Sequence, residues 1–359
     1  MKKLLAIVMC LAMVFTLAAC GGSSAPASSN NAASNTPAPA ASGNEQAAAP
    51  AGQTYTIKLG HACSSAHPYN QGAEKFKELV EAGSNGAITV ELYPDSTLGA
   101  ERDLIEGLQM GSVEMCIVST APLSSYTDSF LAYDLPFLFT SLEQARGVVD
   151  SSIGQDMLDT LANNGIVGLC YFENGFRHFT NNDHVIDDPG DIKGMKIRVM
   201  ENQVMMATIT ALGGSPTPMA FNELYTALQQ KTIDGEENPI LQIYDKKMYE
   251  VQHYITLSGH FYAPAPLLMS KNFYDSLPAE YQQLVKDAAL EARDYMRGRN
   301  DAEEAEKLDE MVTKYGCEVT ELTAEQQQAF IDAVQPVYDE YVGEGKLINP
   351  ELVKSIQDF

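Results

Sequence analysis

The residues best placed to do chemistry are two arginines and an asparagine near predicted strand ends. Arg198 lies in the alternating strand-like run MKIRVM, before the helical stretch ENQVMMATITALGG. Arg177 follows an apolar strand in YFENGFRHFTN, and Asn238 follows a turn in KTIDGEENPI. Guanidinium forks and an amide NH₂ can satisfy a carboxylate, and open α/β sheets bind ligands at the carboxyl ends of their strands. The pattern predicts a carboxylate receptor; the alternative is a solvated face that carries cations.

Motifs of the common enzyme classes are missing from the sequence. It contains no G-x-S-x-G, H-E-x-x-H, C-x-x-C or G-x-G-x-x-G, and no phosphate-binding glycine loop. His61, Cys63 and His67 lie close together in sequence, but no second group of metal ligands accompanies them. We therefore expect no catalytic residues, no cofactor and no metal.

The elements that must position these residues alternate between strand and helix. Extended runs at 54–63, 87–94 and 113–120 enclose helical runs at 67–83 and 99–112. This alternation predicts an α/β fold with a largely parallel sheet.

Later in the chain, SLEQ and TAEQ are capping boxes that predict the starts of two helices at Ser141 and Thr323. An amphipathic stretch from Pro278 to about Tyr315 predicts one long helix. It is longer than one lobe requires, so we expect it to bridge two lobes.

The N-terminus indicates export. A short basic start and an apolar run, Leu4 to Ala19, end in LAAC, which resembles a lipobox with Cys20 as the lipidated residue. The following Gly, Ser, Ala and Pro-rich residues predict a disordered tether up to residue 53. We expect a chain anchored by lipid to the outer face of a bacterial cell membrane.

Composition narrows the partners further. The chain has 48 acidic and 23 basic residues and a formal charge of −25, which argues against nucleic acid or anionic lipid as a partner. Any bound carboxylate must rely on local arginines, because the overall field repels it. Cys63, Cys116, Cys170 and Cys317 are expected to be free thiols, since two of them lie in apolar strand-like runs.

The segment from Arg177 to Ile240, which includes KGMKIR and DGEENP, resembles the substrate-binding proteins of tripartite ATP-independent periplasmic (TRAP) transporters, the DctP family. LGAERDLIEGLQMG, DLPFLF, GFR and VQHYITLSGHFYAP extend the resemblance over essentially everything after the tether. It implies a two-lobed, periplasmic-binding-protein-like clamshell, a monomer that closes on an organic acid and delivers it to TRAP permease subunits. Lobe I would comprise residues 54–174 plus about 263–302, and lobe II residues 175–262 plus about 303–359.

The resemblance also implies site residues. Arg198 matches the signature arginine that pairs with the ligand carboxylate, Arg177 the second arginine, and Asn238 the asparagine that hydrogen-bonds the same group. Phe221 lies where a ring packs on the ligand. Glu101 and His67 lie where the opposite lobe contributes selectivity.

Three other functions remain open from the sequence. A receptor for an ATP-driven importer would use the same two-lobed architecture, and a sensor would pass its bound ligand to a signalling partner. A secreted lipoprotein enzyme that acts on an acidic sugar is the third. The organic acid itself is left open among dicarboxylates, uronates, sialic acid and keto acids.

Overall fold

The computed structural model describes residues 52–359. The predicted leader (1–19), Cys20 and all but the last two residues of the predicted tether lie outside the described residues. The described strands are β1 Tyr55–Gly60, β2 Ile88–Tyr93, β3 Met115–Ile117, β4 Ile166–Asn181, β5 Lys196–Val199, β6 Ser215–Pro218, β7 Gly235–Asn238, β8 Tyr254–Ser270 and β9 Glu318–Glu321. The described α-helices are α1 Pro68–Gly83, α2 Glu101–Met110, α3 Leu142–Asp150, α4 Ser152–Asp159, α5 Gln203–Ala211, α6 Phe221–Gln229, α7 Ile240–Asp245, α8 Lys271–Ser276, α9 Ala279–Thr313, α10 Ala324–Ala333, α11 Gln335–Tyr341 and α12 Pro350–Gln357.

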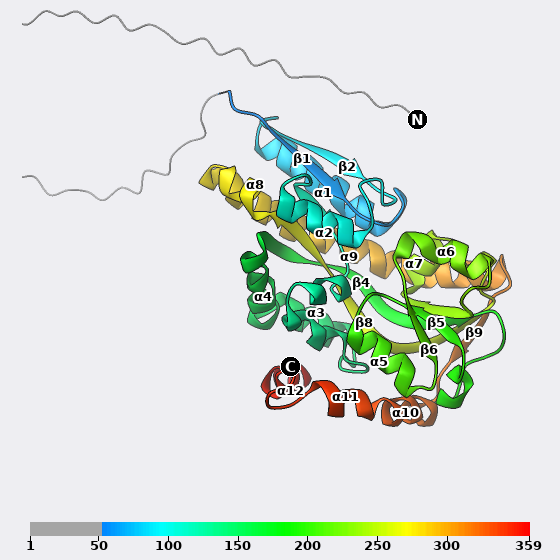
Figure 1. Ribbon diagram of the computed structural model, residues 1–359. Coiled ribbons are helices and arrows are strands. Elements are labelled where there is room, and N and C mark those ends of the chain that lie inside the picture. The colour runs from blue at the N-terminus through cyan, green and yellow to red at the C-terminus, as the bar shows by residue number, and fades with distance from the viewer. Residues whose placement is uncertain (1–51) are drawn as a thin grey trace, which may run out of the picture. The chain divides into compact units, whose positions relative to one another are not determined.

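The strands of the described chain form one mixed sheet in the order β2-β1-β3-β8-β4-β7-β5-β6, with β9 paired to β8. The two ends are parallel: β2-β1-β3 on one side and β7-β5-β6 on the other. Between them, β8 pairs antiparallel with β3 and β4, and β4 pairs antiparallel with β7. Figure 1 shows β4 and β8 running through the middle of the molecule.

The prediction of a largely parallel sheet is therefore wrong for its centre. The βαβ alternation from which it came occurs only at the two ends. The central strands β4 and β8 have 16 and 17 residues and carry internal glycine and proline, which obscure the strand pattern. The α/β class is confirmed.

Helix termini follow the local sequence. Asn202 caps α5 by accepting hydrogen bonds from the amides of Val204 and Met205, and α1 ends at Gly83. The predicted capping box at Thr323 is complete, because the Gln326 side chain also accepts from the Thr323 amide. Ser141 caps α3 as predicted. These short-range contacts satisfy backbone amides that the first helical turn leaves unpaired.

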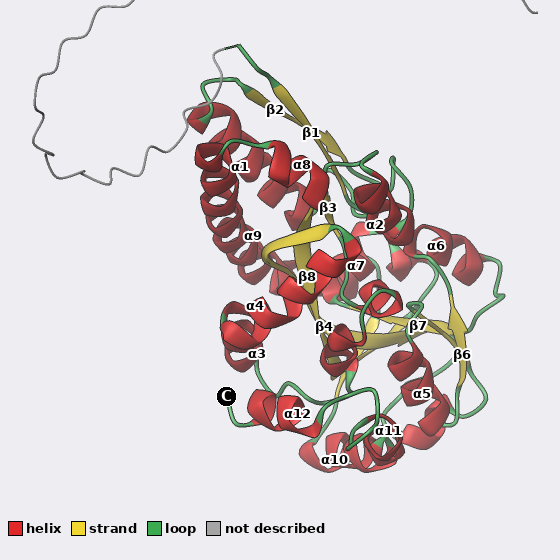
Figure 2. Cartoon of the chain, turned by 60° about the vertical axis from the view of Figure 1, so that its left-hand side comes forward, coloured by secondary structure: helices red, strands yellow, loops and turns green. Residues whose placement is uncertain are grey.

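The long helix α9 bridges two hydrophobic cores. It has 35 residues, about 50 Å of helix at 1.5 Å per residue. Its first half contributes Val285 and Met296 to the core of the N-terminal strands, where α1 lies beside it (Figure 2). Its last turns contribute Met311 to a smaller core under α6 and α7. The expectation of a long bridging helix is confirmed.

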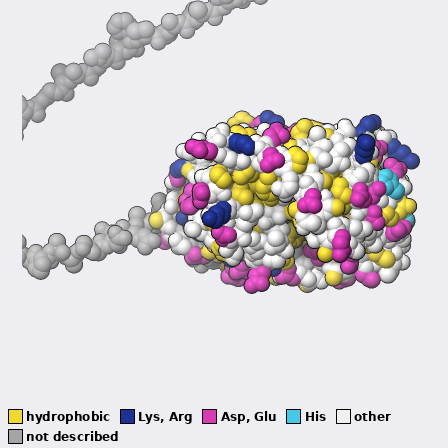
Figure 3. All heavy atoms as spheres, turned by 90° about the horizontal axis from the view of Figure 1, so that it is seen from below, with side chains coloured by type: hydrophobic (Ala, Val, Ile, Leu, Met, Phe, Trp, Pro, Cys, Tyr) yellow, Lys and Arg dark blue, Asp and Glu magenta, His cyan; other side chains and the backbone are white. Residues whose placement is uncertain are grey.

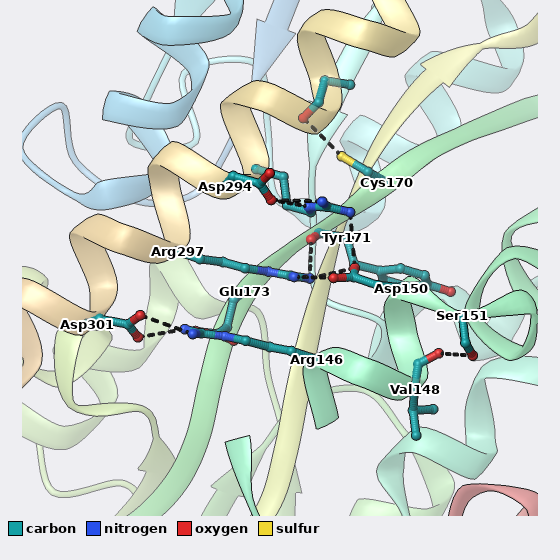
Figure 4. Close-up of polar contacts among 12 residues, drawn as sticks. Arg146, Val148, Asp150, Ser151, Cys170, Tyr171, Glu173, Asp294, Arg297 and Asp301 are labelled. Carbon is teal, nitrogen blue, oxygen red and sulfur yellow. Dashed lines mark hydrogen bonds and ion pairs between the residues drawn. The ribbon is translucent and has the colours of Figure 1, made fainter. Parts of the chain in front are cut away.

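Charged contacts fix α9 against β4 and α3 (Figure 4). Arg297 of α9 contacts Asp150 at 2.6 Å and donates to the Tyr171 carbonyl oxygen at 2.8 Å. A second arginine, Arg146 of α3, contacts Asp301 of α9 at 2.6 Å and Glu173 of β4 at 2.7 Å. Glu173 is buried, so its carboxylate requires this pairing, and the contact fixes the middle of β4.

The surface and the thiols agree with the composition. Acidic side chains are spread over the face shown in Figure 3, with fewer basic ones among them. Within residues 52–359 the four cysteines are buried and unpaired, as expected. Over the same residues, the helices are all too short or too polar to span a bilayer.

Candidate functional site

A cavity lies where the ends of several elements meet, and it contains about 320 Å³ of empty space including its opening. Its lining comes from the β1–α1 segment, the starts of α1 and α2, the segment just after β3, the middle of β4, the ends of β5 and β7, and the starts of α6 and α7. These residues are Ala62, Cys63, Tyr69, Glu101, Ser119, Asn174, Arg177, Arg198, Met200, Phe221, Asn238 and Gln242. The structure thus brings together five of the six predicted ligand contacts.

Arg177 is buried and held by the neighbouring strand β7. Its Nε donates to the Glu237 carboxylate at 2.5 Å and its Nη2 to the same carboxylate at 2.9 Å. Burial acts to lower the pKa of Arg177, but the Glu237 carboxylate outweighs this and raises it. Nη1 has no hydrogen-bond partner among residues 52–359. One edge of the guanidinium is fixed, and Nη1 remains available.

Arg198 has the same arrangement with a weaker partner. Its Nε and Nη2 both donate to the Met219 carbonyl oxygen, at 3.0 and 2.7 Å, and its buried Nη1 is unpaired. Burial, and then repulsion by Arg177, lowers its pKa to about 10. The Phe221 ring centroid lies 6.0 Å from the guanidinium carbon. Within the part of the chain that the structure describes, Arg198 is therefore a buried cation without a carboxylate partner, which is the complement of an anionic ligand.

Asn238 is held between two charged neighbours. Its side-chain oxygen accepts from Arg177 Nη2 at 3.0 Å, and its Nδ2 donates to Glu236 at 2.5 Å. Glu236 also accepts from Thr180, and burial raises its pKa to about 7. Asn238 lines the cavity with one amide hydrogen still available, so it can both orient Arg177 and donate to a ligand.

Glu101 reaches the cavity from the first turn of α2. Its Oε1 accepts from the Ser119 amide at 2.7 Å and from the Ser119 hydroxyl at 3.0 Å. Ser119 in turn accepts from Asn174 Nδ2 at 3.3 Å. Because Asn174 donates to Ser119 through Nδ2, its side-chain oxygen points away from Ser119 and has no partner among the described residues. Burial of the carboxyl group raises the pKa of Glu101.

The structure does not bring His67 to this cavity. His67 is the N-cap of α1, and its Nδ1 accepts from the Tyr69 amide at 3.1 Å. Burial lowers its pKa to about 4, so the ring is neutral. His67 therefore positions Tyr69, which does line the cavity.

Arg177 also differs from its sequence interpretation in one respect: it lies within β4 (Ile166–Asn181), four residues before the strand's end, and does not follow a finished strand. Gly175, with φ of +116°, interrupts the run of larger side chains within β4. The strand continues because both β7 and β8 pair with it.

Sequence reasoning missed Tyr69, Asn174 and Gln242. Each is buried, lines the cavity and has an unpaired side-chain polar atom. A signal existed for two of them: Asn174 is three residues before Arg177, and Gln242 is one helical turn after Asn238. Tyr69 had no such signal, because its approach depends on the β1–α1 segment.

A second cavity of about 340 Å³, again including its opening, shares Glu101, Arg198, Met200 and Phe221 with the first. It adds Arg102, which is 57% exposed and contacts Glu106 at 3.2 Å and Glu201 at 3.5 Å. Arg198 and Phe221 therefore border both cavities. Residues 52–359 contain no group of three histidine, cysteine, aspartate or glutamate side chains able to hold a metal ion.

Polar contacts join the β1–α1 segment to α7, and both of these contribute residues to the cavity lining. Ser64, beside the N-terminal core, donates its amide to Asp245 at 3.0 Å, and its hydroxyl also contacts that carboxylate. Lys246 contacts Asp95 at 2.8 Å. A mixed α/β fold with a cavity lined by two buried arginines is typical of a two-lobed receptor for a small anion.

Comparison with known proteins gives the family. Residues 59–344 match the model for "bacterial extracellular solute-binding protein, family 7", and the chain belongs to this family. The C4-dicarboxylate-binding periplasmic protein of Rhodobacter capsulatus is 36% identical over 79% of this chain and 85% of its own length.

Solved structures agree. A TRAP periplasmic solute-binding protein from Polaromonas, bound to D-erythronate, is 38% identical, covers 84% of this chain and 98% of its own, and has a TM-score of 0.81. The sugar acid binding protein of Advenella mimigardefordensis, in complex with galactonate, is 35% identical, covers 85% and 97%, and has a TM-score of 0.82. This chain is therefore a solute-binding receptor of the TRAP transporter type with the clamshell fold of that class.

Proposed function

We propose that this protein captures an organic acid outside the cytoplasm through a carboxylate–arginine clamp and presents it to the TRAP permease subunits. One observation supports the clamp: Arg177 and Arg198 are each fixed through Nε and Nη2, and each leaves a buried, unpaired Nη1 at the same cavity. A carboxylate offers two oxygens that can accept from two such donors.

The proposed roles follow from the partners that each side chain already has. Arg198 is the main clamp, because it has no protein carboxylate to neutralise it. Arg177 and Asn238 assist, the first with Nη1 and the second with its remaining amide hydrogen. Phe221 packs against the ligand, and Glu101 contributes selectivity. Each charged hydrogen bond adds roughly 1.5–3 kcal/mol, so two or three fit the ~8 kcal/mol of micromolar binding after ordering costs.

The remaining proposals concern the whole protein. We propose that it does no chemistry on its ligand, acts as a monomer, and is attached to the outer face of the cell membrane through lipidated Cys20. We also propose that the lobes divide as the sequence predicts, at about residues 174, 262 and 302. A Cys20→Ser variant tests the anchor, because it should move the protein from the membrane fraction to the medium.

A thermal-shift screen of organic acids tests the function, together with mass spectrometry of any ligand retained through purification. We expect at least one carboxylate to raise the melting temperature and its uncharged amide to have no effect. Recovery of the ligand unaltered after long incubation excludes an enzyme acting on that compound. Stabilisation by uncharged sugars alone would contradict the proposal.

A further inference from the structure

The cavity holds a second set of polar groups that the arginine clamp does not use. We name Tyr69, Glu101, Asn174 and Gln242 the acceptor set. Tyr69, Asn174 and Gln242 are at least nine-tenths buried. Among the described residues, the Tyr69 hydroxyl, the Asn174 Oδ1 and both polar atoms of the Gln242 amide have no hydrogen-bond partner. Buried polar groups are almost always hydrogen-bonded, so four such atoms at one cavity indicate ligand groups that pair with them.

The orientation of these groups restricts what can pair with them. The Ser119 hydroxyl donates to Glu101 and accepts from Asn174 Nδ2, so the Asn174 oxygen is the atom left for a ligand. Glu101 uses Oε1 for both contacts with Ser119 and can accept further through Oε2. Asn174, Glu101 and the Gln242 oxygen therefore call for hydrogen-bond donors.

A second carboxylate cannot supply donors, and the charges at the cavity do not accommodate it. Arg177 is neutralised by Glu237, so one ligand carboxylate balances Arg198. Among the residues that line the two cavities, the one further cation is Arg102, which is exposed and already contacts Glu106 and Glu201. Glu101 would repel a second anionic group.

We infer that the ligand is a monocarboxylate that carries several hydroxyl groups, with its carboxylate on Arg198 and Arg177 and its hydroxyls on the acceptor set. Hydroxyl groups fit because each donates one hydrogen bond and accepts others, as Tyr69 and the Gln242 amide require. This inference rests on the proposed carboxylate clamp and selects one ligand class from those that the clamp alone would accept.

The test compares acids of equal chain length by isothermal titration calorimetry on the purified protein. At four carbons the probes are 2,3,4-trihydroxybutyrate, butyrate and succinate; at six carbons they are a pentahydroxyhexanoate, hexanoate and adipate. We expect the hydroxylated monocarboxylate to bind at least about tenfold more tightly than the unsubstituted acid and the dicarboxylate at one or both lengths. A dicarboxylate that binds as tightly or more tightly at both lengths overturns the inference and leaves the clamp intact. If none of these acids binds, or if an acid binds equally well to the wild type and to Arg198→Ala, the result counts against the clamp itself.

Two variants assign the effect to the acceptor set. Gln242→Leu removes no hydrogen bond within the protein, so it should keep the unliganded melting temperature while it weakens the hydroxylated acid about tenfold or more and leaves butyrate unchanged. Glu101→Gln should weaken the hydroxylated acid and reduce its advantage over the dicarboxylate. Arg102→Gln is the matched control outside the acceptor set and should change neither ratio by more than about twofold. If Arg102→Gln abolishes dicarboxylate binding and Gln242→Leu has no effect, the inference is wrong.

Discussion

The two arginines of the cavity are built from the same side chain but are stabilised differently. Arg177 forms a buried ion pair with Glu237, whereas the hydrogen bonds that Arg198 makes within residues 52–359 go to the Met219 carbonyl oxygen. Both leave Nη1 free, so both can hold a ligand. The difference shows that one arginine belongs to the folded structure as much as to the site, while the charge of the other is left for the ligand to neutralise.

The largest effect is expected from breaking the Arg177 ion pair. Glu237→Gln leaves Arg177 as a buried and unneutralised charge, and losing one partner of a buried pair costs about 3–5 kcal/mol. Chemical denaturation of the unliganded protein measures this loss. A loss below about 1 kcal/mol would show that Arg177 does not depend on Glu237.

Removing Arg198 should affect binding instead of folding. Arg198→Ala deletes a buried cation that has no protein counter-charge, so we expect the unliganded melting temperature to change little. Two charged hydrogen bonds to the ligand are lost, and affinity should fall at least about a hundredfold. Thermal shift with and without a stabilising acid measures both quantities. A large drop in unliganded stability would instead indicate a structural role.

Stability measured as a function of pH tests the carboxyl group of Glu236, which bonds Asn238 beside Arg177. Burial raises the pKa of Glu236 to about 7 from the ordinary value of 4.5. The folded state therefore holds this proton more tightly than the unfolded state, so the contribution of Glu236 to stability is complete below about pH 4.5 and is lost as the pH rises through 7. Glu236→Gln should remove this dependence.

The measurement is the difference in unfolding free energy between the wild type and Glu236→Gln at pH 4.5 and at pH 7.5. We expect this difference to shift by about 1–3 kcal/mol in favour of the variant at the higher pH. Parallel curves for the two proteins would mean that Glu236 titrates normally.

The smallest effect is expected at the polar contacts between the cores. Lys246 and Asp95 form an exposed pair at 2.8 Å, and such pairs contribute at most about 1 kcal/mol. Asp95→Asn should weaken ligand binding by less than about threefold in calorimetry. A larger loss would show that this contact controls closure over the ligand.

Much of the site could be predicted from short motifs. Arg198, Arg177, Asn238, Phe221 and Glu101 all line the cavity, and they are separated by as many as 137 positions in the sequence. The sequence could not show that Asn238 is already bonded to Glu236 and Arg177, because that contact depends on the pairing of β7 with β4. His67 lies beside a site motif in the sequence, but in the structure it caps helix α1 and does not line this cavity.

The sequence by itself determined the features that depend on near neighbours: the helix caps at Asn202 and Thr323, the length of α9, the acidic surface and the motifs of the family. Hydrogen bonds within a few residues and the periodicity of apolar side chains decide these features locally. Only the tertiary structure decided that β4 and β8 run antiparallel through the sheet centre, and that Tyr69, Asn174 and Gln242 meet at one cavity. These long-range contacts depend on strand register and on packing between distant segments, which no short stretch of sequence specifies.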